Sequence, residues 1–432
     1  MRTRRLRFPC RALAAISTTA LAATAGAQAE GSAPAVPLLF PGLVNKAERE
    51  AGNPLATYAA LLDLEAQYRS SKPFAGIYPE VRATYAEFLG VPLAGVQAMS
   101  LPMLRQEPST GEQAIDPGFA PEAAVAVIAR AAAQTRLVIF GEEHHLPQTR
   151  SLYEPLLREL WQRGYRYLAA ETFTPAVMTP AWKGPGYDTG YYIQDPVYAS
   201  AVRTARQLGY QLIAYDTAER GPQGDGSFRD RTQAQTLERL VFARDPKAKL
   251  LVFAGRGHAA EVPPPDGWTP MASVLKQITG IDPFTIYAPT MSQRQTPAEE
   301  HALYRWATAH DLVQQPVIFV DRRQDRCLGS GNCDAWVFWP RVTIVDGRPD
   351  WLAKTLGRKA VPIPAAIAGG HGLRLAQAFA DGEPATFVPV DQVLLRDGEP
   401  LPVLMLPAGS FWLRVIDAQG TVAGPAVQKV QA

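Results

Sequence analysis

Two stretches of the chain decide its fold: LVIFGEEHH (residues 137–145) and LLVFAGRGH (residues 250–258). Each is an unbroken apolar run that ends at a glycine and continues into polar residues and a histidine. Such runs predict strands that are buried on both faces, as in a parallel sheet covered by helices. Similar runs recur along the chain and alternate with helical stretches; they are RYLAA (166–170), QLIAY (211–215), FTIYA (284–288) and PVIFV (316–320). This alternation predicts an α/β fold with a mostly parallel central sheet and helices on both faces.

The flanking regions differ in pattern from this core. Apolar residues recur at helical spacing from about 44 to 100, and residues 101–120 are polar and rich in proline. The last sixty residues contain short apolar runs between Asp-Gly and Gln-Gly turns, which predict strands. We therefore expect a helical N-terminal region with its linker at 30–120, an α/β catalytic-like domain at 121–365 and a small β-sandwich-like domain at 372–432.

The first 29 residues predict a cleaved signal peptide. They contain five arginines and no acid, then an Ala-rich apolar run, and they end in Ala27-Gln28-Ala29. A basic start, an apolar stretch and an A-x-A site are the three parts of a secretory signal. We expect cleavage after Ala29 and a periplasmic or secreted protein. Cleavage would take the formal net charge from +2 to −3.

The composition excludes two classes of partner. Lys and Arg number 43 against 41 Asp and Glu, and no basic run occurs beyond the signal. A nucleic-acid partner is therefore not expected. No stretch of the mature chain approaches the roughly 18 apolar residues of a membrane span, so no span is expected either. A small-molecule or peptide substrate fits this composition, and the sequence does not indicate an oligomeric state.

Two cysteines remain after cleavage, Cys327 and Cys333. They are separated by LGSGN, a turn-forming segment. In an oxidising compartment, this spacing predicts a short disulfide-closed loop with a structural role.

The candidate site lies where the two opening stretches end. Glu142, Glu143, His144 and His145 follow one predicted strand, and His258 follows the other. Further residues at strand ends are Glu171, after RYLAA, and Asp216, after QLIAY. Because ligands of open parallel sheets bind outside the carboxyl ends of the strands, we expect these side chains to share one crevice. Two imidazoles with carboxylates could bind a divalent metal or act as a general base with an orienting acid, and both interpretations stay open here.

The order of these motifs resembles one superfamily. LVIFGEEHH, then AAET, a helix beginning FRDRTQAQ, and LLVFAGRGH are similar to the group that unites erythromycin esterases, ChaN-like haem-uptake proteins and Tiki/TraB proteins. The resemblance covers roughly residues 125–345. The two G-x-x-H units resemble the Tiki/TraB pattern, which implies a hydrolase with a divalent metal on His144, Glu171 and His258, with Glu142 as a further candidate.

The doubled histidine permits two other interpretations. G-E-x-H also matches the ChaN-like proteins and implies a haem- or iron-linked role. Read as G-E-x-x-H, the same string resembles the erythromycin esterases and implies His145 as the base. The helix with Arg229, Asp230, Arg231 and Gln235 resembles the Arg/Glu-rich helix of these families, but its expected glutamate is absent and Asp230 is the candidate substitute. Arg231 and Asp216 are then candidate substrate-binding residues.

These observations predict an exported, metal-dependent hydrolase of ester or peptide bonds. The metal, Mn, Co, Zn or Fe, would activate water while Glu142 or Glu143 accepts the proton. The first alternative is a periplasmic haem- or iron-binding protein of the ChaN-like type without turnover. The second is a metal-independent esterase that uses His145 as its base.

The signal peptide leads to a direct prediction. We expect the intact mass of the exported protein to correspond to a chain that begins at Glu30, because small residues precede that position in the manner of signal-peptidase sites. A mass that retains the five N-terminal arginines would contradict it.

Overall fold

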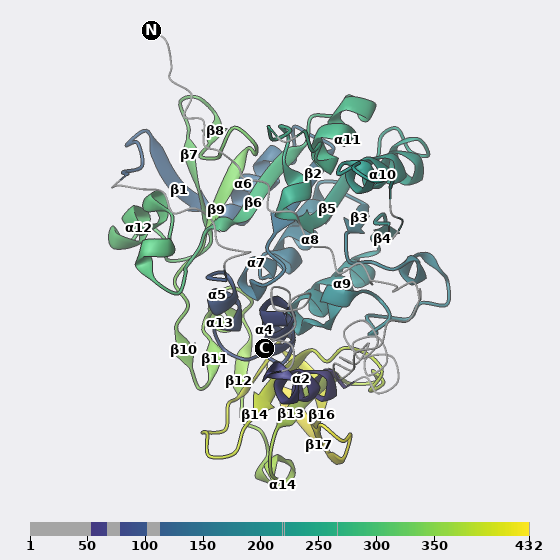
Figure 1. The fold of residues 1–432 in the computed structure, drawn as a ribbon, viewed down its shortest axis with the longest axis vertical. Coiled ribbons are helices and arrows are strands. Elements are labelled where there is room, and N and C mark those ends of the chain that lie inside the picture. Colours follow the sequence, from purple (N-terminus) through teal and green to yellow (C-terminus); the bar gives the residue numbers. More distant parts are fainter. Residues whose placement is uncertain are drawn as a thin grey trace, which may run out of the picture.

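The computed structural model describes residues 53–66, 78–101, 113–217, 219, 221–265 and 267–431. The predicted signal peptide and the first part of the N-terminal region lie outside these residues. Figure 1 shows a central sheet with helices around it, and smaller sheets at one end of the molecule.

The central sheet has nine strands, in the order β1-β7-β9-β6-β2-β5-β3-β4, with β8 paired to β7. The six strands from β9 to β4 are mutually parallel, as predicted. At the other edge, β1, β7 and β8 pair antiparallel, so the PVIFV run is an antiparallel strand in a mostly parallel sheet. The strands are β1 Phe119–Ala123, β2 Leu137–Glu142, β3 Tyr167–Ala170, β4 Gln211–Ala214, β5 Leu250–Gly255, β6 Phe284–Met291, β7 Val317–Asp321, β8 Arg326–Cys327 and β9 Ala335–Phe338.

Helices cover both faces of this sheet. Every residue of β2 and β5 is buried, and alternate side chains of β2 join different cores: Val138 and Phe140 on one face, Leu137 and Ile139 on the other. The first face is covered by α6 Ala124–Ala131, α8 Tyr153–Gln162 and α9 Pro196–Leu208. The second is covered by α10 Phe228–Leu237, its π-helical continuation η3 Glu238–Phe242, and α11 Met271–Thr279. The continuous apolar runs reflect this two-sided burial.

Shorter elements connect these layers. The short helix α7 Pro147–Arg150 follows β2, and α12 Ala302–Ala309 follows β6. Single helical turns lie at strand ends and in connections: η1 Pro175–Met178, η2 Tyr191–Gln194, η4 Arg256–Ala259 and η5 Pro297–Glu299. Two of them, η2 and η4, carry residues of the candidate site.

The C-terminal part forms separate antiparallel sheets. Four strands pair in the order β14-β13-β16-β17: β13 Arg374–Ala380, β14 Asp391–Leu395, β16 Gly409–Asp417 and β17 Val422–Val430. The apolar run at 385–391 is not a strand, and the central strand β13 pairs with both β14 and β16. The remaining elements are β10 Ile344–Val345, β11 Arg348–Pro349, α13 Trp351–Lys354, β12 Lys359–Val361, α14 Ala365–Ala368 and β15 Leu404–Leu406.

The segment 362–372, at the boundary expected between the α/β domain and the C-terminal domain, contributes to a core. Ile363, Ile367 and Ala368 are buried against the C-terminal sheet, and β12 pairs with β15 across the expected boundary. The α/β part and the C-terminal part are therefore continuous in packing.

The N-terminal helices pack on the C-terminal sheet, as Figure 1 shows for α2 and α4 beside β13, β14 and β16. They are α2 Pro54–Asp63, α4 Tyr78–Phe88 and α5 Ala94–Ala98. Phe88 and Leu89 are fully buried in a cluster with Leu375 and Leu394. Backbone bonds extend this contact, since Leu394 N donates to the Leu89 carbonyl at 2.9 Å. Chain segments about 300 residues apart in sequence thus share one core.

Cys327 and Cys333 carry free thiols in the structure. Cys333 is buried with Phe319, whereas Cys327 packs against the cluster that contains Ile318 and Val320, on the opposite face of β7. A bond between them would require one thiol to change faces, and the disulfide stays a prediction. Within the described residues, no helix combines the length and apolar character needed to cross a membrane.

The shared core predicts that Phe88→Ala destabilises the protein strongly. Removing a fully buried aromatic ring leaves a cavity, which typically costs about 3–5 kcal/mol of unfolding free energy. Denaturant unfolding followed by circular dichroism measures this loss. Val427→Ala, at a site 77% exposed, is the control and should change stability by less than about 0.5 kcal/mol. Equal effects of both changes would contradict the shared core.

Candidate functional site

The carboxyl ends of β2, β5, β3 and β4 bring the predicted residues together. These strands are neighbours in the sheet, and Figure 1 shows them side by side. Glu142 ends β2, His258 lies in the turn after β5, Glu171 follows β3, and Asp216 follows β4. His144, two residues after β2, completes the group. The structure therefore places five of the predicted side chains in one polar cluster.

His144 is held by a buried carboxylate. Its Nδ1 lies 2.8 Å from Oε1 of Glu142. Oε2 of Glu142 in turn accepts hydrogen bonds from Nε of Arg150 at 2.7 Å and from the Tyr153 hydroxyl at 2.8 Å. Burial raises the pKa of Glu142, but the positive charge of Arg150 and the contact with His144 outweigh it and lower the pKa to about 2. Glu142 is thus an anion that orients the ring and leaves Nε2 of His144 facing the cluster.

Arg150 is the support of this arrangement. Its guanidinium is fully buried, and it also donates to Asp195 Oδ2 at 2.8 Å and to the His144 carbonyl at 2.9 Å. One side chain therefore links the end of β2, α7 and the start of α9. A buried cation is tolerated only with such compensation, and here two carboxylates supply it.

His258 forms a second histidine–carboxylate pair. Its Nδ1 lies 2.7 Å from Oδ1 of Asp230, which begins α10 together with Arg229. Asp230 is itself fixed by Trp268 Nε1 at 2.9 Å and by the Met271 amide at 2.8 Å. Burial lowers the pKa of His258, but the negative charges of Glu171 and Asp230 outweigh it and raise the pKa to about 10. His258 is therefore an imidazolium at neutral pH.

Glu171 lies between the two histidines. Its Oε1 is 3.4 Å from His258 Nε2, and its Oε2 is 3.9 Å from His144 Nε2. The Gly255 amide donates to Oε2 at 2.6 Å, and Arg229 donates to Oε1 at 2.7 Å. Burial raises the pKa of Glu171, but His258 and Arg229 hold it well below its usual range. The carboxylate is an anion held by four groups.

Arg229 joins the remaining predicted carboxylate to the cluster. It donates to both oxygens of Asp216, at 2.9 and 2.6 Å, and its Nη1 lies 3.2 Å from His258 Nε2. Gln233, one turn along α10, also donates to Asp216 at 2.8 Å. The cations Arg229 and His258 thus sit among three carboxylates, Glu171, Asp216 and Asp230.

An aromatic ring covers one face of His144. Tyr192 in η2 stacks on the imidazole, with 4.0 Å between ring centroids and 13° between planes. Close beside the ring, a Cβ atom added at Gly255 would lie 2.9 Å from His144 Nε2. Only glycine allows this approach of the β5 backbone to the histidine.

Two predicted residues do not join this cluster. His145 is buried with Nδ1 3.2 Å from Glu143 and Nε2 3.4 Å from Glu80 of α4. Burial lowers its pKa, but these carboxylates raise it to about 10, and both ring nitrogens lie beside carboxylates; His145 as the base stays a prediction. Glu143 pairs with Arg256 at 2.9 Å, away from His144. Glu142 therefore pairs with His144, and Glu143 pairs with His145, so that alternate residues after β2 belong to two separate clusters.

The arginine of α10 that contacts the cluster is Arg229 and not the predicted Arg231. Arg231 is partly exposed and pairs with Asp225, at 3.1 and 2.5 Å, outside the cluster. Arg229 occupies the place expected for Arg231, because the side chains at 229, 230 and 233 face the sheet edge on α10. Gln235 is exposed. The sequence identified this helix as part of the site but did not show which of its faces points toward the cluster.

The sequence analysis did not identify several residues of the site. Arg150, Asp195 and Tyr192 act beside His144, and Glu80 reaches His145 from the N-terminal region. The only sequence signal for Arg150 was its proximity to the GEEHH motif, and Tyr192 lies within a segment, 174–195, that is rich in aromatic residues, glycine and proline. Partners from distant elements leave no local pattern.

The donor atoms of the cluster do not fit a metal as they stand. Arg229 and the Gly255 amide already bond to Glu171, and Nε2 of His258 lies beside the Arg229 guanidinium. Within the described part of the chain, no three His, Cys, Asp or Glu side chains are arranged to hold a metal ion. For haem, Nε2 of His144 is the candidate iron ligand, and Oε2 of Glu171 lies 3.9 Å from it.

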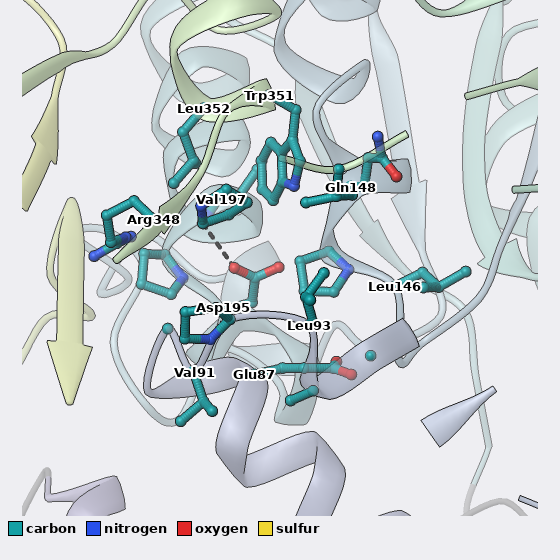
Figure 2. A pocket seen from close by; sticks show the side chains of 18 of the residues that line it. Glu87, Val91, Leu93, Leu146, Gln148, Asp195, Val197, Arg348, Trp351 and Leu352 are labelled. Carbon is teal, nitrogen blue, oxygen red and sulfur yellow. Dashed lines mark hydrogen bonds between the residues drawn. The ribbon is translucent and has the colours of Figure 1, made fainter. Parts of the chain in front are cut away.

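A pocket lies beside residues 146–148, which follow the two histidines in the chain (Figure 2). It encloses about 660 Å³ including its open mouth. Leu146 and Gln148 line it from the segment after His145, and Asp195 lines it from the start of α9. Figure 2 shows apolar side chains around most of it, with Glu87 of α4 in its wall. Through Asp195 the pocket touches the support of His144 but not the cluster itself.

No protein-family model matches the chain, and no curated protein matches it. One solved structure is similar over part of the chain: "The structure of the type III effector HopBA1". The identity is 16%, the match covers 41% of this chain and 90% of that chain, and the TM-score is 0.28.

Glu87 predicts a pH-dependent stability difference. Both of its carboxyl oxygens are buried without a hydrogen-bond partner in the described residues, and burial raises its pKa well above the usual 4.5. Its proton is thus bound in the folded state and lost on unfolding, so its contribution to stability falls as pH rises above about 4.5. Glu87→Gln stays neutral and lacks this fall.

We expect Glu87→Gln to match the wild type near pH 4 and to exceed it by about 1–3 kcal/mol near pH 8. Unfolding free energies at several pH values measure the difference. Glu399→Gln, at an exposed position, is the control. A difference that does not change with pH would contradict the assignment.

Proposed function

We propose that the chain is an exported hydrolase of ester or peptide bonds that works by general acid–base catalysis. One observation carries this proposal: two histidine–carboxylate pairs, His144–Glu142 and His258–Asp230, face each other across Glu171 at the carboxyl ends of the strands. Paired groups with different environments are typical of acid–base sites.

His144 is the proposed general base. Nδ1–H of His144 donates a hydrogen bond to Glu142, which leaves the lone pair of Nε2 toward the cluster. From there it can take a proton from a water molecule as the water oxygen attacks the substrate carbonyl carbon. The stacked ring of Tyr192 restricts the rotation of the imidazole, so the base is held in one orientation.

His258 and Arg229 are the proposed stabilisers of the negative charge. As the carbonyl carbon is attacked, its π electrons move to the oxygen, and the adjacent imidazolium and guanidinium stabilise this oxyanion. When the intermediate collapses, the bond to the leaving group breaks, and the proton from protonated His144 passes to that group. Glu171 holds both cations in place through its contacts with His258 and Arg229.

The metal-dependent mechanism and haem binding stay competing predictions. The contacts of Arg229 with Glu171 and His258 count against a metal at this position, and no step above uses one. The His145 base is replaced by His144 in this proposal, since the carboxylates of Glu143 and Glu80 occupy both nitrogens of His145.

The test uses p-nitrophenyl esters and chromogenic peptides with the mature protein. We expect His144→Ala and His258→Ala to lower kcat/KM by about 10²–10⁴-fold, the usual contribution of an acid–base group. His310→Ala is the matched control, because His310 is exposed and bonds only its own helix, through the Trp306 carbonyl.

A chelator and a spectrum separate the alternatives. Activity that survives EDTA supports the acid–base proposal. Activity that EDTA removes and Mn, Co, Zn or Fe restores would replace it with the metal-dependent mechanism. A Soret band on adding haem, lost in His144→Ala, together with no turnover, would favour a binding protein. Full turnover in both histidine variants would refute the assigned site.

A further inference from the structure

Arg294 is a buried cation without an anion. It follows β6 at the carboxyl edge of the sheet and is 4% exposed. Its guanidinium donates only to neutral oxygens, the Ser292 hydroxyl at 3.1 Å and the Pro289 carbonyl at 3.0 Å. Within the described residues, no carboxylate oxygen lies within 4.0 Å of this guanidinium, although the backbone amide of Arg294 donates to Oε1 of Glu300 at 3.4 Å.

The other buried arginines of the described chain show how unusual this is. Each of the four has a carboxylate oxygen within 4.0 Å: Arg150 with Glu142 and Asp195, Arg348 and Arg358 with Asp391, and Arg374 with Asp397. The carboxylate nearest to Arg294 in sequence, Glu300, is held by Arg341 through two bonds of 2.7 Å. Arg294 therefore lacks the compensation that a buried charge requires.

A second arginine lies beside it. Arg256 follows β5, and β2 lies between β5 and β6 in the sheet, so Arg256 and Arg294 flank the end of β2. Arg256 pairs with Glu143 at 2.9 Å and forms no other ion pair in the described residues. Burial and the positive charge of Arg256 lower the pKa of Arg294 to about 10, although Glu143 and Glu300 act in the opposite direction.

The charges of this group do not balance. Arg256, Arg294 and His145 are cations, whereas Glu143 and Glu80 are the carboxylates in contact with them. Burial raises the pKa of Glu87, which is also nearby, well above its usual range. The group thus has one positive charge in excess, in a region where the low dielectric makes an uncompensated charge costly.

We propose that Arg294 and Arg256 bind an oxyanion, a carboxylate or phosphate group of the substrate. Planar guanidiniums suit such groups because their N–H donors match the spacing of the anion oxygens. Glu142 and Glu143 are adjacent on the chain but serve the two clusters separately, so the anion site adjoins His144. This inference rests on the proposed function and deepens it: the substrate is an ester or amide with an anionic group near the bond to be cleaved.

Binding is tested first, without turnover. Inorganic phosphate and succinate are titrated into the mature protein by calorimetry, and the unfolding temperature is followed with KCl at matched ionic strength. We expect saturable binding and a rise in unfolding temperature that KCl does not produce. In Arg294→Met the affinity should fall by about 10–100-fold, the contribution of charged hydrogen bonds.

Two further variants complete the binding test. Arg294→Gln keeps donors for the Pro289 carbonyl but removes the charge, and it should lose binding in the same way. Arg322→Met removes an arginine that is exposed and pairs with Glu122, and it should bind as the wild type does. Absence of saturable binding to the wild type, or equal binding by Arg294→Met, would overturn the inference.

A second measurement separates this inference from the proposed function. The ratio of kcat/KM for mono-p-nitrophenyl succinate to that for neutral p-nitrophenyl butyrate should exceed one and fall about tenfold in Arg294→Met. Phosphate binding that depends on Arg294 without turnover of either ester would retain the anion site and refute the hydrolase. Turnover with an unchanged ratio would retain the hydrolase and refute the anion site.

Discussion

The buried guanidinium of Arg150 is the interaction on which the rest of the site depends. It contacts Glu142, Asp195 and the His144 carbonyl at once, and so fixes the end of β2 relative to α7 and α9. Without it, Glu142 would be a buried anion beside the Tyr153 hydroxyl, and burial would favour its protonation. Because Arg150 keeps this carboxylate ionised, His144 is held in one orientation with Nε2 free. A single buried guanidinium thus fixes the orientation of the base that we propose.

The same edge of the sheet holds two charge clusters with different properties. Around Glu171, three carboxylates enclose two cations, so each cation has a carboxylate partner. Around Glu143, the cations exceed the carboxylates in contact with them, and within the described residues the Arg294 guanidinium has no carboxylate partner. Side chains alternate in direction after β2, which sends Glu142 and His144 to one cluster and Glu143 and His145 to the other. The proposed base and the proposed anion site therefore lie next to each other at the end of β2.

Much of the α/β core was predictable because its strands are buried on both faces. Continuous apolar runs such as LVIF and LLVFA have few other stable placements, and the parallel strands they predict are confirmed. The direction of β7 was not predictable, because an apolar run carries no sign of whether its neighbour runs parallel or antiparallel. The packing of Phe88 and Leu394 in one cluster could not be predicted either, because contacts between distant segments leave no local pattern in the sequence.

The sequence by itself determined where the polar residues end the strands, because glycine and charged groups cannot continue a buried apolar run. It thereby placed Glu142, His144, Glu171, Asp216 and His258 at one edge. Only the tertiary structure decided which of them act together: the rotation of α10 selected Arg229 over Arg231, and the approach of α4 enclosed His145 between two carboxylates. Orientation and charge compensation depend on neighbours that are distant in the chain, so they arise only when the elements pack.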